Sequence, residues 1–300
     1  KKHLLFLLAF LFFNNVFFSQ TKIDSALDMM NVDSIHDSTK ILKLYRAISS
    51  LSYENPDSAN KLLDIGLNYL QISKQLFQTD SNRRLKKDFY RVRYYNLKGI
   101  CFYLLNRESE CLENWLKTEK IAKIDNDTNF LLSISNNIAI VYSTTGREKD
   151  ALKIFRDQKK IYETKKDTGG IITSSINMST IIKNNDSIVL LLNNALDLAI
   201  SSDLSNSFTN IYVNLAGTYL DTNSKKTFSF KKAKACLDSL ILYANKQSDN
   251  ESKVQYYGGI SEYYILKNQY NLALKNAKKG AELSKQMTGL TSLDLLSKLY

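Results

Sequence analysis

A pattern of small and large residues recurs along the chain at an interval of about 40 residues. Each copy carries a small residue followed three positions later by an aromatic one, and the small residues are Gly99, Ala139, Ala216, Ser261 and Ser297. Met178, followed by Ile181, occupies the matching place in a degenerate copy. Successive markers lie 40, 39, 38, 45 and 36 residues apart. A near-constant period of this size predicts a stacked array of repeats.

A second small residue follows the first within each copy, at Cys111, Ala151, Ala233 and Ala273. A large residue stands four positions after the first three of these, and residues four apart share one face of a helix. In 136–155, NNIAIVYSTTGREKDALKIF, two such faces flank a Thr-Gly turn. Each repeat is therefore predicted to be a helical hairpin whose backbones approach closely where the small residues lie.

The composition favours an all-α fold, since the chain holds only 10 glycines and a single proline, Pro56. Pro56 suits the first position of a helix and Asn55 suits its N-cap. We expect a helix over residues 37–51 and another from Pro56. Extra residues around 224–228 predict a longer loop in that copy.

These features resemble the tetratricopeptide repeat (TPR), which has a small residue and an aromatic on its first helix and an Ala and an aromatic on its second. The resemblance covers roughly residues 37–300 and implies a right-handed α-solenoid of about six to seven hairpins. The last hairpin is expected to be truncated after a first helix that carries Ser297 and Tyr300. The segments 55–59 and 166–171 resemble the TPR regions of exported sensor proteins of Bacteroidetes type.

Residues 1–20 differ from the rest of the chain. Lys1 and Lys2 precede an unbroken apolar run over residues 4–13, which predicts a secretory signal peptide. An uncleaved membrane anchor is the alternative. Residues 21–300 would then form the TPR-like solenoid in the periplasm or on the extracytoplasmic side of the inner membrane.

The net charge is +11, or +9 once residues 1–20 are removed. Lysine-rich solvated helix faces account for this charge, and we expect this segment to bind no nucleic acid. Contact with a membrane is expected only through the signal segment or a span beyond residue 300. Of the three cysteines, Cys111 is expected to be a buried thiol. A bridge between Cys101 and Cys111 stays open as an alternative.

Few residues suit catalysis. His36 is the only histidine after residue 20, and it lies in a polar segment. Imidazole acid–base chemistry and multi-histidine metal sites are therefore excluded. No glycine-rich phosphate loop is present, and the acidic pairs 108/110 and 125/127 fall in turns and helix starts. We expect no catalytic residue, no metal site and no cofactor.

The resemblance implies that partners bind in the groove lined by the first helices. Mapped onto this chain, the groove residues are Arg93, Asn96, Tyr103, Ser133, Asn136, Asn137, Asn210, Asn214 and Gln255. Recurrent asparagine suits a peptide backbone because its amide both donates and accepts hydrogen bonds. Ile100, Ile140 and Gly217 stand where the family's carboxylate clamp has an asparagine, so capture of a C-terminal carboxylate is not predicted.

We therefore expect a non-enzymatic module that binds a protein or peptide segment on its concave face. The resemblance implies a sensor or scaffold part of a signal-transduction protein, with a histidine kinase or a helix-turn-helix regulator as output. A free-standing exported scaffold of the envelope is the first alternative. An enzyme on a helical scaffold is the second.

Overall fold

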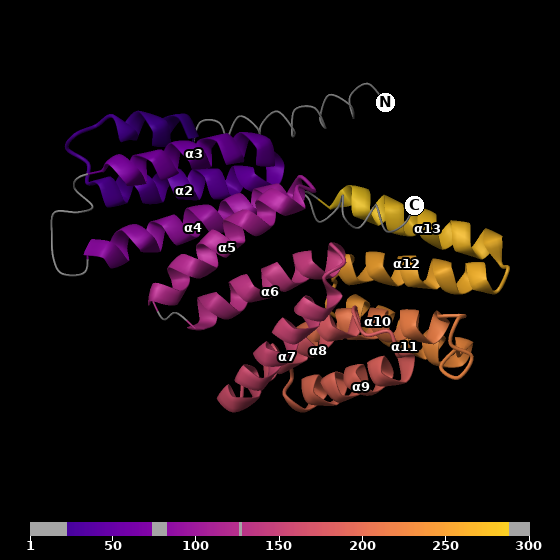
Figure 1. The fold of residues 1–300 in the computed structure, drawn as a ribbon. Helices are drawn as coiled ribbons and strands as arrows, with labels where there is room; N and C mark the ends of the chain where they lie inside the picture. Colours follow the sequence, from indigo (N-terminus) through magenta and orange to yellow (C-terminus); the bar gives the residue numbers. More distant parts are fainter. Residues whose placement is uncertain (1–22, 74–82, 126–127, 288–300) are drawn as a thin grey trace, which may run out of the picture. The chain divides into compact units, whose positions relative to one another are not determined.

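The computed structural model describes residues 23–73, 83–125 and 128–287 (Figure 1). Every regular element within these residues is helical, and consecutive helices pair as hairpins. This confirms the predicted all-α class. The predicted signal segment 1–20 and the predicted last helix of a truncated hairpin lie outside the described residues. The chain divides into two compact units, Lys1–Val141 and Tyr142–Tyr300, which are described separately.

The N-terminal unit contains α2 (Asp37–Glu54), α3 (Pro56–Ile72), α4 (Arg83–Leu104) and α5 (Glu108–Asp125). Each packs against the next, and α2 also contacts α4. The sequence explains where α2 and α3 begin. His36 Nδ1 accepts a hydrogen bond from the Ser38 amide at 3.2 Å, and Asn55 Oδ1 accepts one from the Ser58 amide at 3.0 Å. Pro56 is the first residue of α3, as predicted.

Small residues set the close approach of helices in this unit. A methyl group added to Gly99 would stand 2.4 Å from Nε1 of Trp115, so α5 can approach α4 only because residue 99 lacks a side chain. Cys111 and Trp115 are both buried. The small-and-large pattern predicted from the sequence is therefore the packing contact of this hairpin.

Helix α6 (Thr128–Thr144) spans the boundary between the units, and α7 (Glu148–Lys165) follows it after a short turn. Gly146 adopts φ +80°, a conformation that glycine accommodates without strain. The Arg147 amide donates to the Tyr142 carbonyl at 2.8 Å and closes the turn. Ala139 and Ala151 are both fully buried, as the pattern in 136–155 predicts.

The C-terminal unit continues with α8 (Thr168–Ser179), α9 (Asn185–Ser201), α10 (Phe208–Leu220), α11 (Phe230–Lys246), α12 (Asn250–Leu266) and α13 (Tyr270–Gln286). Successive helices contact one another from α7 to α13, and α10 also contacts α8 and α12. The degenerate copy is a true hairpin, α8 and α9, although α8 has only 12 residues. The longer loop predicted near 224–228 is the connection between α10 and α11.

Side-chain caps start most helices of this unit. Asp167, Asn184, Ser229 and Asp249 each accept a hydrogen bond from a backbone amide two or three residues ahead. These short polar side chains satisfy amides that have no partner within the helix. The chain turns between hairpins at Lys166-Asp167 and at Ser248-Asp249, where Lys166 and Ser248 adopt positive φ angles. The right-handed sense of the solenoid stays a prediction.

Candidate functional site

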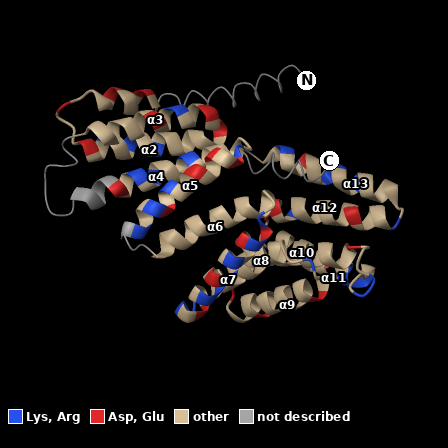
Figure 2. Ribbon diagram, in the orientation of Figure 1, with Lys and Arg blue, Asp and Glu red and all other residues tan. Residues whose placement is uncertain are grey.

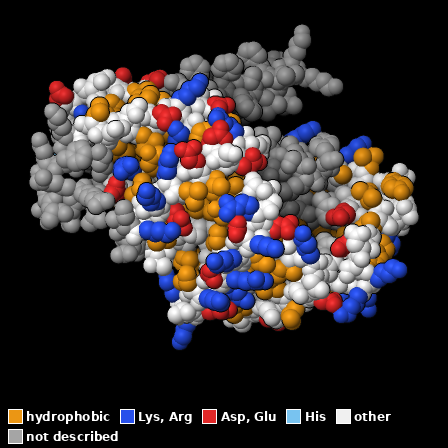
Figure 3. Space-filling model, viewed as in Figure 1, with side chains coloured by type: hydrophobic (Ala, Val, Ile, Leu, Met, Phe, Trp, Pro, Cys, Tyr) orange, Lys and Arg blue, Asp and Glu red, His pale blue; other side chains and the backbone are white. Residues whose placement is uncertain are grey.

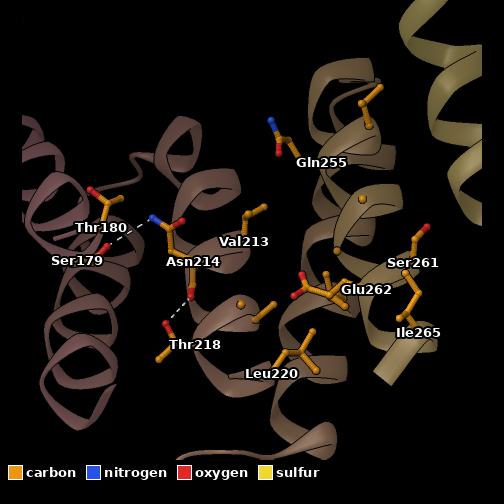
Figure 4. A pocket seen from close by; sticks show the side chains of 16 residues that line it. Ser179, Thr180, Val213, Asn214, Thr218, Leu220, Gln255, Ser261, Glu262 and Ile265 are labelled. Atoms are coloured by element: carbon orange, nitrogen blue, oxygen red, sulfur yellow. Dashed lines mark hydrogen bonds between the residues drawn. The ribbon is translucent and has the colours of Figure 1, made fainter. Parts of the chain in front are cut away.

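A pocket of about 570 Å³ opens between the first helices of successive hairpins in the C-terminal unit. Its walls come from the end of α8, from α10 and from α12 (Figure 4), and Leu237 of α11 also lines it. Because α10 contacts both α8 and α12, the exposed faces of these three helices form one surface. This is the surface that the groove prediction assigns to partner binding.

Glycine gives the pocket its space. A methyl group added to Gly217 would meet no atom within 4 Å, so this residue leaves open room on α10. Gly258 and Gly259 line the opposite wall on α12. A methyl group on Gly259 would stand 2.8 Å from Cδ2 of the buried Leu237, so this glycine allows α12 to pack closely on α11.

Amides and hydroxyl groups supply the polar lining. Asn214 Nδ2 donates to Ser179 Oγ at 3.5 Å, which links α10 to α8 (Figure 4). Thr218 and Thr180 donate to carbonyls of their own helices, at 2.7 Å and 2.8 Å. The Gln255 amide is half-buried and hydrogen-bonds to no other described residue. It is therefore available to a ligand.

Among the residues that the structure describes, Glu262 is the only charged one that lines this pocket. Its side chain reaches from α12 towards α10 (Figure 4). Helices α6, α8 and α10 contain no Lys, Arg, Asp or Glu, whereas α7 carries both signs along its length (Figure 2). Glu262 as a residue is exposed, but desolvation of its carboxyl group raises the pKa above the ordinary value.

Three of the predicted groove residues belong to these helices. Asn214 and Gln255 both line the pocket. The packing of α10 on α12 brings these two residues to the same open space. Asn210 is exposed on α10, one turn before Asn214, and does not line the pocket itself.

The other predicted groove residues lie in the N-terminal unit, on α4 and α6. Arg93 stacks on the Phe89 ring, with its Cζ 3.4 Å from the ring centroid. Asn96 Oδ1 accepts a hydrogen bond from Trp115 Nε1 at 3.1 Å, so part of its amide already stabilises the hairpin. Residues on an exposed or half-buried part of the surface are Tyr103, Ser133, Asn136 and Asn137.

Sequence reasoning missed several pocket residues. Ser179, Gly217 and Glu262 each stand one position after a repeat marker, and Leu220 and Ile265 stand four after. Most of the predicted residues stand six, three or two positions before the markers, whereas Tyr103 stands four after Gly99. All these positions share one helical face. Applying the positions one and four after the marker to every repeat is the signal that would have found them.

A second pocket, of about 590 Å³, lies between α3, α4 and α5 in the N-terminal unit. Its charged groups all have ionic partners. Lys98 bonds Asp64, and Lys117 Nζ lies 2.6 Å from Glu113 Oε1 and 5.7 Å from the Tyr95 ring centroid. Arg91 and Glu110 pair with residues outside the lining, Asp88 and Arg107.

The described residues contain no group of three or more His, Cys, Asp or Glu side chains placed to hold a metal ion. His36 is an exposed helix cap. The three thiols are free, and burial raises the pKa to about 11 for Cys101, 12 for Cys111 and 11 for Cys236. The pKa values keep these thiols protonated at neutral pH, so none is an activated nucleophile.

Surface charge is dispersed. On the face drawn in Figure 3, basic and acidic side chains alternate with hydrophobic ones, as on solvated helix faces. Among the helices of residues 23–287 that the structure describes, none has the length and apolarity needed to cross a bilayer.

No protein-family model matches the chain, and no curated protein does. Three similar solved structures are NprR in complex with its cognate peptide NprX, the apo form of RapI, and the Rap conjugation gene regulator of plasmid pLS20 with the Phr* peptide. The NprR structure has a TM-score of 0.63 at 17% identity, and the match covers 92% of this chain and 75% of NprR. The RapI structure has a TM-score of 0.59 at 14% identity, with 92% of this chain and 97% of RapI covered. The pLS20 regulator has a TM-score of 0.54 at 15% identity, with 90% of this chain and 76% of the regulator covered. The chain has the TPR-like helical-repeat fold of these proteins.

Proposed function

We propose that this chain is a non-enzymatic module that binds a peptide, or an extended segment of a protein, in the pocket between α8, α10 and α12. The observation that carries the proposal is the position of this pocket on the joined faces of three first helices. Repeat proteins of this kind bind ligands on extended concave surfaces.

The lining suits a peptide backbone. An extended peptide presents both N–H and C=O groups, and each must find a partner when it leaves water. Asn214 and Gln255 carry amides that donate and accept, and Ser179 adds a hydroxyl group. Gly217 leaves space for close approach of a backbone.

Two of the similar structures support the same proposal. NprR was solved with its peptide NprX, and the pLS20 Rap regulator with the Phr* peptide. The apo form of NprR from B. thuringiensis, at TM-score 0.55 and 17% identity, is described as a quorum sensor. A chain of the same fold, with an open groove lined by amides, hydroxyl groups and apolar side chains, suits a peptide ligand.

We further propose that binding serves signal transduction, as a sensor or scaffold on the extracytoplasmic side of a membrane. The sequence of residues 1–20 and the resemblance to exported TPR sensors support this part. N-terminal sequencing of protein from fractionated cells tests it. A mature N-terminus near residue 21 in the exported fraction is expected, and full-length protein confined to the cytosol would refute it.

A fluorescent reporter at the pocket tests peptide binding directly. The structure suggests Thr180→Cys, because Thr180 is exposed at the rim, Cys101 and Cys111 are buried, Cys236 is half-buried, and all three natural thiols have raised pKa values. An environment-sensitive dye would then label position 180 selectively. A pool of N-acetylated, C-amidated random heptapeptides should change its emission in a saturable way. The same dye on Ser201→Cys, at the end of α9, should not respond.

Two variants test whether the pocket side chains cause the change in dye emission. Asn214→Ala and Gln255→Ala should each weaken binding about fivefold, because each removes a hydrogen bond worth about 1 kcal/mol. Asn245→Ala, on an exposed part of α11, is the matched control and should bind normally. Equal affinity of all three variants, with unchanged circular dichroism, would show that the pocket is not the binding site.

A further inference from the structure

We propose that the pocket selects peptides that carry a lysine or arginine side chain, and that Glu262 pairs with this cation. The inference rests on the proposed function and adds the chemical class of the ligand. It follows from the position of one carboxylate within an otherwise uncharged groove.

Glu262 has no ionic partner among the described residues. Some other acids of this unit are paired: Asp238 Oδ1 lies 2.5 Å from Lys234 Nζ, and Glu148 Oε2 lies 3.0 Å from Lys183 Nζ. The chain is rich in lysine, yet no described lysine pairs with the pocket carboxylate.

The pocket around Glu262 strengthens the attraction between its carboxylate and a cation of the ligand. The pocket walls withdraw the Glu262 carboxyl from water, which raises the energy of its charged form. An ammonium or guanidinium group restores the lost solvation through a charge-assisted hydrogen bond. The net charge of +11 repels a cationic peptide at long range, so selection must come from this short-range contact.

The spacing along α12 favours a side chain of an internal residue. Gln255 and Glu262 are seven residues apart on one face of the helix, a rise of about 10 Å. An extended peptide covers that distance with about three residues. A backbone bound near Gln255 therefore continues to the level of Glu262, where a long basic side chain can reach the carboxylate.

Sorted peptide pools test the inference. Five pools of heptapeptides carry Lys, Arg, Gln, Leu or Glu at the central position and random residues elsewhere, with acetylated and amidated ends. The reporter is the dye on Thr180→Cys. The Lys and Arg pools should bind about tenfold more tightly than the Gln pool, which corresponds to about 1.4 kcal/mol. The Glu pool should bind most weakly.

Glu262→Gln should remove the difference between the Lys and Gln pools. The matched control is Glu282→Gln, which deletes the same charge from an exposed position on α13 and should keep the difference. Loss of the difference in Glu262→Gln alone supports the pairing.

Other outcomes overturn the inference in separable ways. If the reporter protein that retains Glu262 binds the Lys and Gln pools with equal affinity, cation selection is refuted and peptide binding stands. A preference that appears only with free amino termini assigns Glu262 to a terminal amine and refutes the side-chain pairing. Failure of every pool to bind refutes both this inference and the proposed function.

Discussion

The α-carbon of Gly66 lies directly against the phenol ring of Tyr94. A methyl group on Gly66 would stand 2.0 Å from Cε1 and 2.7 Å from Cζ of that ring. Tyr94 is fully buried, and its hydroxyl group donates to the Ile41 carbonyl at 2.8 Å. One ring thus joins α2, α3 and α4, and it has no room to move away.

Gly66→Ala should therefore destabilise the protein. The added methyl group overpacks a site whose ring is held by burial and a hydrogen bond, at a cost of about 1–3 kcal/mol. Gly217→Ala is the matched control, because its methyl group meets open space. That variant should gain up to about 1 kcal/mol from helix propensity. Urea unfolding of both variants measures the difference, and an equal effect of the two would contradict the packing described.

Ala139→Leu should destabilise the protein by about 1–3 kcal/mol, since Ala139 is fully buried and a larger side chain overpacks its surroundings. Thermal unfolding followed by circular dichroism measures the effect. Ser133→Leu on the same helix is the control, because Ser133 is exposed and should tolerate the change. An unchanged melting temperature for Ala139→Leu would refute the repeat register.

Acid should weaken the N-terminal unit through Asp37. Burial alone would raise the pKa of Asp37, but hydrogen bonds from Ser73 and Tyr69 and the charge of Lys40 lower it overall. A folded pKa below the unfolded one stabilises the protein at pH values above about 4. That contribution should disappear as the pH falls through the folded pKa.

Asp37→Asn isolates this contribution. At about pH 6 the variant should be less stable than the parent protein by about 2 kcal/mol, the scale of hydrogen bonds to a charged group. The difference should shrink as the pH falls through the lowered folded pKa, where the parent aspartate gains a proton. A pH-independent difference in the free energy of unfolding would rule out the charge of Asp37 as the cause.

The cysteines should react slowly in the folded protein. Cys101 and Cys111 are fully buried, and burial raises the pKa of each thiol, which suppresses the reactive thiolate. Brief alkylation followed by mass spectrometry should find the native thiols largely unmodified, and all three modified in urea. Rapid alkylation of Cys101 or Cys111 in the native protein, or a mass showing an intramolecular disulfide, would contradict the description of these thiols as free and buried.

Local patterns predicted the helices well because their causes are local. Asn55 and Pro56 start α3 through a cap and a fixed backbone angle, and both act within four residues of sequence. The marker Gly99 and the large residue Trp115 meet within one hairpin, so their 16-residue separation is visible as a repeat. The contact between Gly66 and Tyr94 joins different hairpins, and no period of the sequence specifies it.

The site was predicted only in part. Asn214 and Gln255 were found because they lie on the groove side of first helices. Asn96 has the same sequence position in its repeat as Asn136, yet Trp115 engages its amide oxygen. Such engagement depends on side-chain contacts between helices, which periodicity does not contain. Glu262 was missed because Gln255, which precedes the marker Ser261, was the only groove residue predicted on this helix.

Filling the pocket tests the central claim most directly. Gly217→Leu places a side chain in the open space on α10, where an added methyl group meets nothing within 4 Å. The measurement is the affinity of the random heptapeptide pool for Gly217→Leu beside that for Gly217→Ala, with the dye on Thr180→Cys. We predict that Gly217→Leu binds at least about tenfold more weakly, a loss of about 1.4 kcal/mol, while its melting temperature is not lowered. Unchanged peptide affinity in a folded Gly217→Leu variant would contradict the assignment of this pocket as the peptide site.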